Sequence, residues 1–433
     1  MTDDKLEETG VVTVFLRHEA AVLLLRRSAE VGSDSGQWGG VAGHAEGDPD
    51  AAARREIREE TDLGAEAVTL VRAGDSFEAA DPDLRTLWVV HPYLFDAATR
   101  AVEPNDGTTA HEWVPPTEIR RRETVPDLWG SYDRVRPTVE TVASDREHGS
   151  AYLSVRALEV LRDEAALVAE SGDTAADAWP ALADLARDLR EARPAMPVVG
   201  NRVDRAMAAA SDERTAAAVE RAAGDEIARA LAADKRAAAR AAERLPARVA
   251  TLSRSGTVRA ALRRADPDAV LVAESYPGRE GVDTAERLAR ETTADVTIAT
   301  DAAFAGALAD ADCEALVVGA DAVLPDGSVL NKVGTRGATA AAAREGLDCF
   351  VVAASDKVLP AGEDTEDDPP RVDREERDPA AVYDGPADLA VSNPTFDLTP
   401  ADRIDAVVTE DGVLDAADVC EMAQRHRDRA DWD

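Results

Sequence analysis

The chain has 433 residues, too many for one ordinary domain, so we expect two or three. Its formal net charge is −37, and only four of its 49 basic residues are lysines. This charge argues against direct nucleic-acid binding, which needs clustered positive residues, and the three arginines at 120–122 are too few to form such a surface. An acidic surface that is poor in lysine predicts adaptation to concentrated salt, where self-repulsion is screened.

The first elements in the chain predict a mixed β-sheet with a helix. Two apolar runs, Val11–Leu16 and Ala21–Leu25, are typical of a β-hairpin. A glycine-rich stretch at 38–47 follows, and then Asp48 and Pro49, which suit the cap and first turn of a helix. Further strands are predicted at Val68–Ala73, Thr86–Phe95 and 112–114, and a helical stretch at 116–122.

The predicted helix carries three carboxylates on one face. Glu56, Glu59 and Glu60 are spaced i, i+3 and i+4. Like charges this close repel one another, so the cluster gains from a bound cation, and hard divalent cations such as Mg²⁺ prefer oxygen ligands. A solvated acidic helix face is the alternative that the triplet alone leaves open.

Strand, glycine-rich loop and acidic helix together resemble the Nudix hydrolases, whose signature joins a glycine to an Arg-Glu-aliphatic-x-Glu-Glu core. The resemblance implies a Nudix α/β/α sandwich and gives Arg55 the role of orienting the helix. It implies that Mg²⁺ or Mn²⁺ is bound by Glu56, Glu59, Glu60 and Gly43. This chain departs from the family where Asp62 replaces a helix-ending glycine, although Asp can adopt the left-handed conformation needed there. The stretch from Gly43 to Arg55 is also shorter than the family pattern.

The pattern changes after a polar linker at 144–150, so we place the first domain at residues 1–145. Residues 151–245 are rich in alanine and arginine with helical periodicity, interrupted at 192–197, and predict an antiparallel helical subdomain. Residues 246–425 then alternate apolar runs with helices, including 284–291 and 338–345. The runs are Val249–Leu252, Ala269–Ala273, Asp295–Ala299, Ala315–Val318 and Cys349–Ala353. They predict buried parallel strands in a Rossmann-like α/β domain, whose ligands bind at the carboxyl ends of the strands.

The turns after these strands carry a second resemblance. They contain Gly319-Ala320-Asp321, then Asn331-Lys332-Val333-Gly334-Thr335, and Asn393-Pro394-Thr395-Phe396-Asp397 near the end. Together they look like the family that joins the regulatory subunits of translation initiation factor 2B to sugar-phosphate isomerases such as ribose-1,5-bisphosphate isomerase. The family also implies a homo-oligomer that associates through the α/β domain.

These turns make chemical sense as a sugar-phosphate pocket. Amides and hydroxyls at 253–257 can wrap a phosphate at a helix N-terminus, and a lysine supplies a point charge. Asp321 at a strand end can move a proton between adjacent carbons, as aldose–ketose isomerisation requires. The alternative is that Asp321 and Asn331 only tie strand ends together. The candidate binding residues are Ser253, Arg254, Ser255, Asp321, Asn331 and Lys332.

Three departures argue against isomerase activity. The isomerases carry a cysteine where Ser253 stands, and a serine hydroxyl is a far weaker acid than a thiol. Their early Arg-Gly-Ala loop corresponds to 171–175 here, which has no arginine, and Tyr276 replaces another arginine. We therefore expect a domain that binds a sugar phosphate or nucleotide without isomerising it.

Two function classes follow. The first is Mg²⁺-dependent hydrolysis of a nucleoside diphosphate-linked metabolite, with Glu103 or Glu112 as the base by location, fused to a sensing domain. The second is a non-enzymatic, factor 2B-like regulatory or binding protein, and a sugar-phosphate isomerase is a weaker third option. Three widely spaced cysteines indicate a reducing cytoplasm, and no apolar run is long enough to span a membrane.

Overall fold

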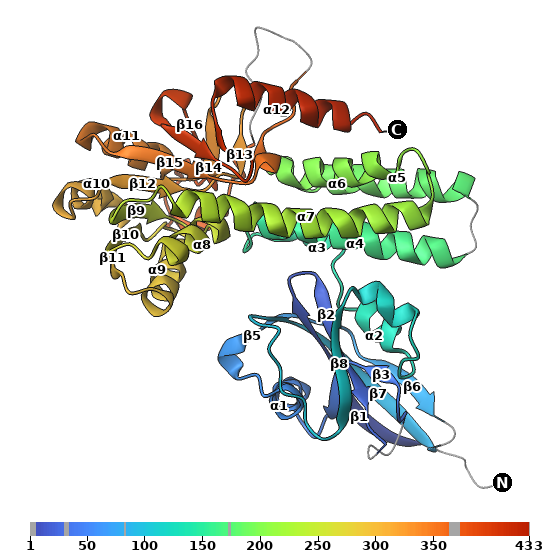
Figure 1. The fold of residues 1–433 in the computed structure, drawn as a ribbon. Helices are drawn as coiled ribbons and strands as arrows, with labels where there is room; N and C mark the ends of the chain where they lie inside the picture. The colour runs from blue at the N-terminus through green and yellow to red at the C-terminus, as the bar shows by residue number, and fades with distance from the viewer. Residues whose placement is uncertain (1–5, 30–33, 82–83, 172–174, 363–372, 433) are drawn as a thin grey trace. The chain divides into compact units, whose positions relative to one another are not determined.

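The computed structural model describes residues 6–29, 34–81, 84–171, 175–362 and 373–432. The chain divides into two compact units, Met1–Thr138 and Val139–Asp433, each with its own hydrophobic core. Figure 1 shows the first unit as a sheet with helices and the second as a helical region joined to a layered α/β region. Over the described residues, no helix combines the length and the apolar character that crossing a bilayer requires.

The first unit is built on an eight-stranded mixed sheet, with the central order β3-β2-β1-β7-β5. Its strands are β1 (Glu7–His18), β2 (Ala21–Arg27), β3 (Trp38–Gly39), β4 (Val41–His44), β5 (Val68–Ala73), β6 (Phe77–Asp81), β7 (Thr86–Ala97) and β8 (Thr108–Val114). β1 and β2 form the predicted hairpin, while β1 and β7 run parallel. The predicted helical stretch after β8 is a 3₁₀ helix, Pro116–Arg120, and η1 (Ala65–Ala67) is another.

Helices cover both faces of this sheet because alternate strand residues point to opposite sides. On one face, Val12, Val14 and Leu16 pack with residues of α1 (Pro49–Thr61). On the other, Phe15 and Leu24 pack with residues of α2 (Leu128–Asp133). This is the predicted sandwich, and its helix α1 presents its outer face to a possible ligand.

The second unit begins with long helices rich in alanine. They are α3 (Val139–Ser144), α4 (Ser150–Ser171), α5 (Ala175–Glu191), α6 (Pro197–Ala210) and α7 (Ala216–Ala242). The predicted interruption at 192–197 separates α5 from α6. Asn201 ties this helical region to the sheet region, since its Nδ2 donates to the carbonyls of Asp356 (2.7 Å) and Val358 (2.9 Å).

A seven-stranded sheet follows, in the order β11-β10-β9-β12-β15-β17-β18, and it is parallel except for the last strand. Its strands are β9 (Arg248–Leu252), β10 (Ala269–Ala273), β11 (Asp295–Ala299), β12 (Ala315–Val318), β15 (Asp348–Val352), β17 (Ala406–Val408) and β18 (Val413–Leu414). The prediction of burial is wrong for β11, where Ile298 is 46% exposed. β11 is an edge strand with one strand neighbour, so its apolar residues lack the cover that central strands receive.

Helices lie on both faces of this sheet, which is the doubly wound arrangement. They are α8 (Gly256–Ala265), α9 (Glu280–Glu291), α10 (Asp301–Asp310), α11 (Thr335–Glu345) and α12 (Ala416–Arg429). Short 3₁₀ turns stand at Ser355–Lys357 (η3), Pro379–Ala381 (η4) and Ala401–Arg403 (η5). A small sheet of β13 (Ala322–Val323), β14 (Val329–Lys332) and β16 (Phe396–Thr399) follows from the carboxyl end of β12.

Candidate functional sites

Local signals in the sequence set the position of helix α1. Asp48 caps its start by accepting a hydrogen bond from the amide of Asp50 (3.0 Å), and Pro49 occupies the first turn. Asp62 ends the helix in the left-handed conformation, at φ 58°, where the family pattern has glycine. Ile57 is buried in the core, which turns the acidic positions 56, 59 and 60 away from it.

Gly43 on β4 makes room for the first acid. A Cβ built at Gly43 would lie 2.1 Å from Cδ of Glu56, so only glycine leaves this carboxylate against the strand. Arg55 binds the same carboxylate through Nη2 at 2.9 Å. It also donates to the carbonyl of His44 at 3.0 Å, which links α1 to the end of β4. Arg55 therefore fixes both the helix and the Glu56 side chain.

Glu60 is the most perturbed acid of the cluster. Burial raises its pKa to about 7, and the charges of Glu56 and Glu59 act in the same direction. The amide of Ala42, 3.3 Å from Oε2, and the nearby guanidinium of Arg27 oppose this rise only in part. A buried carboxylate with acidic neighbours gains stability from a cation, because the cation supplies the missing positive charge.

The donor set fits a hard cation in its chemistry, since all side-chain donors are carboxylate oxygens. Over the described residues, however, no three acidic, histidine or cysteine side chains converge closely enough to hold a metal. Glu56 accepts a hydrogen bond from Arg55 and Glu60 accepts one from the amide of Ala42. Of the candidate bases, Glu112 is bound to Arg122 at 2.8 Å, and the amide of Glu103 binds Thr61 at the end of α1.

The second site lies at the carboxyl end of the parallel sheet. Asp321 follows β12, and its Oδ1 accepts a hydrogen bond from Ser150 Oγ at 2.8 Å. Ser150 is the first residue of the 22-residue helix α4, so the positive end of that helix lies beside the carboxylate. The helical region therefore contributes to the sheet-edge site, which the sequence did not reveal.

Two of the four lysines of the chain lie near Asp321. Lys357 is buried, and its Nζ donates to the carbonyl of Ala320. Burial lowers the pKa of Lys357 and of Lys332, while the charge of Asp321 opposes that change in both. Asp321 thus lies near two basic side chains.

Lys332 is not a free point charge. Its Nζ binds Oε1 of Glu280 at 2.6 Å, and Arg377 binds the same oxygen at 2.9 Å. Oε2 of Glu280 is buried and has no hydrogen-bond partner among the described residues. An incoming phosphate would therefore compete with Glu280 for two cations. Arg377 supplies a guanidinium that the sequence argument missed, because it stands far from any strand-end turn.

The loop that the sequence predicts to bind a phosphate lies at the start of α8. Ser255 caps this helix by accepting from the amide of Val258 (3.3 Å), while Arg254 is exposed. A Cβ at Gly319 would lie 2.8 Å from Oγ of Ser255 and 3.8 Å from Oδ1 of Asn331, so these residues lie together. Asn331 itself binds Thr335 at 2.9 Å, which also supports the tying role considered as the alternative.

Other residues of the predicted motifs make hydrogen bonds that hold loops and helix ends in place. The amide of Ser253 donates to Ser275 Oγ at 2.8 Å, which fixes the loop after β9. Asp397, in the last of the motifs, caps α11 by accepting from the amides of Gly334 (2.7 Å) and Arg336 (3.1 Å). Tyr276 is 54% exposed. Of the 171–175 stretch compared with the phosphate loop, residues 172–174 lie outside the described residues.

Two known families match this chain, and each match corresponds to one of the two structural units. Residues 7–135 match the NUDIX domain, and residues 146–416 match the initiation factor 2 subunit family. A ribose 1,5-bisphosphate isomerase of Haloferax volcanii is 34% identical over 299 residues, which is 65% of this chain and 90% of that protein. A methylthioribose-1-phosphate isomerase of Pseudomonas fluorescens is 35% identical over 178 residues. This chain spans about half the length of that second relative, 48%, and the match covers 39% of this chain.

Solved structures support the fold of the second unit. The translation initiation factor eIF-2B of Pyrococcus horikoshii aligns with a TM-score of 0.54 and 23% identity, over 64% of this chain and 94% of that one. The tetrameric eIF2B-beta2-delta2 complex of C. thermophilum aligns with a TM-score of 0.52 and 19% identity, over 66% of this chain and 92% of that one. At these identities, the likeness concerns the fold alone.

Proposed function

Because this chain belongs to the initiation factor 2 subunit family and carries a NUDIX domain, we propose that it joins a hydrolase to a sugar-phosphate sensor. The first unit hydrolyses a nucleoside diphosphate-linked metabolite with Mg²⁺ or Mn²⁺. The second unit binds a sugar phosphate or nucleotide without isomerising it. The oligomer that the family implies remains part of this proposal.

The observation that carries the hydrolase is the half-buried carboxylate of Glu60, whose pKa is raised to about 7 by desolvation, with a smaller contribution from the charges of Glu56 and Glu59. When bound, Mg²⁺ would neutralise the bridging phosphates and activate a water molecule. Glu56, Glu59, Glu60 and the carbonyl of Gly43 are the groups proposed to hold it. Arg55 keeps Glu56 in position by donating two hydrogen bonds to Oε1, from Nε at 3.3 Å and from Nη2 at 2.9 Å.

Binding in the second unit rests on the cations at the sheet edge. Lys332 and Arg377 share Glu280, and a phosphate dianion can replace that carboxylate with stronger charge-assisted hydrogen bonds. The amides at the start of α8 add the partial positive charge of a helix N-terminus. Ser253 in place of the family's cysteine argues that the bound ligand is recognised and not converted.

A sugar-phosphate isomerase is the second candidate. It is favoured by Asp321, whose carboxylate is held by Ser150 and lies near two lysines. In this case, Asp321 would transfer a proton between adjacent carbons, and the hydroxyl of Ser253 would assist. A purely regulatory protein without enzymatic activity is the remaining alternative.

One experiment separates these candidates. Phosphate release from a panel of nucleoside diphosphate derivatives is measured with Mg²⁺ in molar potassium chloride, for the native chain and for Glu59→Gln and Glu60→Gln. Turnover that both substitutions abolish supports the hydrolase, and unchanged turnover rejects it. In parallel, ribose 1,5-bisphosphate is assayed for isomerisation, and Asp321→Asn should abolish any conversion that Asp321 catalyses.

A further inference from the structure

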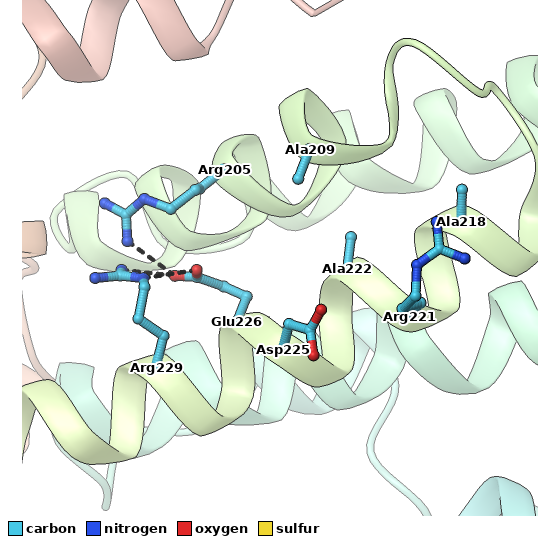
Figure 2. Close-up of a pocket in the computed structure, with 8 residues that line it drawn as sticks. All are labelled: Arg205, Ala209, Ala218, Arg221, Ala222, Asp225, Glu226 and Arg229. Carbon is cyan, nitrogen blue, oxygen red and sulfur yellow. Dashed lines mark hydrogen bonds and ion pairs between the residues drawn. The ribbon is translucent and has the colours of Figure 1, made fainter.

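A second pocket lies in the helical region, away from both sites described above. It is formed by α6 and α7 and has a volume of about 230 Å³. Figure 2 shows its lining, which is Arg205, Ala209, Ala218, Arg221, Ala222, Asp225, Glu226 and Arg229. The positions on α7 repeat every three or four residues, so they share one face of that helix. Ala209, Arg221 and Asp225 are exposed, which opens the pocket to solvent.

Two of its arginines are held in place by ion pairs with buried carboxylates. Arg205 binds Glu226 at 3.0 Å, and Arg229 binds the same carboxylate through Nε and Nη2, both at 2.7 Å. Both arginines also bind Asp356, which is fully buried and accepts a third guanidinium from Arg202 at 3.0 Å. Burial alone would raise the pKa of Asp356, but Arg202 and Arg205 outweigh burial and lower it.

These contacts leave hydrogen-bond donors available. Arg229 uses Nε and Nη2, so its Nη1 has no acceptor within the described part of the chain. Arg221, at the mouth of the pocket, binds Glu213 through Nη2 alone. Guanidinium groups that are already fixed lose little rotational freedom when a ligand arrives, which favours binding.

The surroundings add positive charge in a chain whose net charge is −37. Arg429 of α12 lies close enough to Arg205 and Arg425 that their repulsion adds to burial in lowering its pKa. The acids that face the pocket are Asp225 and Glu226, and Glu226 is already shared by two guanidinium groups. Such a concentration of arginine is unexpected on an acidic surface unless it has a structural or binding role.

The apolar wall limits the size of a ligand. Ala209, Ala218 and Ala222 contribute only methyl groups, and any larger side chain there would fill the space. The volume is below the roughly 300–1,000 Å³ that is typical of pockets for drug-sized molecules. Planar guanidinium groups match the oxygens of phosphate in pairs.

We propose that the pocket between α6 and α7 is a binding site for a small phosphate-bearing anion, separate from the sheet-edge site. Arg205 and Arg229 would bind the phosphate, Arg221 would add positive charge at the other end of the pocket (Figure 2), and the alanines would contact a small apolar or sugar portion. The proposal does not depend on the hydrolase or on the sheet-edge ligand. The alternative is that the arginines serve only to join α6 and α7 to η3 through Asp356.

Isothermal titration calorimetry with inorganic phosphate in molar potassium chloride tests this proposal. All variants are made in a full-length Lys332→Gln background, so that the sheet-edge site contributes little heat. Ala209→Glu places a carboxylate in the pocket and should weaken binding by about tenfold or more. Arg221→Gln removes one exposed cation and should weaken it by about three- to tenfold.

Matched controls are available on α7. Ala228→Glu and Arg236→Gln make the same chemical changes at exposed positions outside the pocket and should leave the affinity within about twofold, as surface charges in high salt do. The melting temperature of each variant confirms that it folds. Absence of phosphate binding in the Lys332→Gln protein, or equal affinity in Arg221→Gln and Arg236→Gln, would overturn the site.

Discussion

The pKa values of two carboxylates, Glu60 in the first unit and Asp356 in the second, shift in opposite directions. In the first unit, Glu60 lies beside two further acids, and its pKa rises to about 7. In the second, Asp356 lies beside three arginines, and its pKa falls. Burial disfavours the charged form in both cases, so the charge of the neighbours decides the outcome. Asp356, with its three arginines, joins α6 and α7 to η3, whereas Glu60 lacks a comparable set of cations, which supports the proposed metal site.

Glu280 of the sheet-edge site is intermediate between Glu60 and Asp356. Glu280 has two cations, Lys332 and Arg377, and hydrogen bonds to both through one oxygen. Its second oxygen is buried and finds no hydrogen-bond partner in the part of the chain that the structure describes. The charge of Glu280 is more than compensated, but its hydrogen bonding is incomplete, which suits a site where a ligand exchanges with a side chain.

The largest expected effect comes from removing the uncompensated acids. Glu60→Gln should lower Mg²⁺-dependent hydrolysis by about 100-fold or more, the range for loss of a group that acts directly on the reaction. Phosphate release under saturating Mg²⁺ measures it. Glu78→Gln, an exposed acid on β6, is the matched control and should retain activity. Equal activity in the two variants would show that the acids of α1 are only a solvated face.

A pH dependence of stability should follow from the same carboxylate. The pKa of Glu60 in the folded state is above its ordinary value of 4.5, so the folded state binds this proton more tightly than the unfolded state. Its contribution is present at acidic pH and is lost as pH rises from about 4.5 through 7, by up to about 3 kcal/mol.

Thermal unfolding of the full chain without divalent cations measures this contribution. The stability of the native chain should fall over this pH range relative to Glu60→Gln, and Mg²⁺ should reduce the difference at pH 7 because metal binds the deprotonated form. Parallel curves for the two proteins would contradict the assignment.

A smaller effect is expected at the sheet edge. Lys332→Gln should weaken sugar-phosphate binding by about 1.5–3 kcal/mol, the value of a charge-assisted hydrogen bond. Calorimetry with ribose 1,5-bisphosphate measures it, and Lys235→Gln on α7 controls for loss of one lysine charge. Tighter binding in Lys332→Gln would mean that Glu280 opposes the ligand more than Lys332 attracts it.

The smallest of these effects should come from Gly43→Ala. The added Cβ would meet the Glu56 carboxylate, which ends a flexible side chain and can move, so the fold should survive. Moving a positioned catalytic group typically costs about tenfold to 100-fold in rate. Gly130→Ala in α2 meets only Arg134 Nη1 at 3.7 Å and should leave activity unchanged. Full activity in Gly43→Ala would show that the reaction does not depend on the position of Glu56.

The sequence alone determined the elements whose signals are local. The start of α1 at Asp48 and Pro49, its end at Asp62, and the strands at 68–73 and 269–273 all agree with the structure. Periodicity and capping depend on neighbouring residues, so they can be read along the chain. The two family resemblances were also confirmed, because their motifs are short and contiguous. The salt adaptation and the metal ligands remain predictions.

Only the tertiary structure decided which charges meet. Ser150 and Asp321 are separated by 171 residues, and Arg377 and Glu280 by 97, so no periodicity relates them. The exposure of β11 depends on its place at the edge of the sheet, which its apolar sequence does not encode. Whether a buried charge is compensated depends on packing between distant elements, which the order of residues along the chain does not reveal.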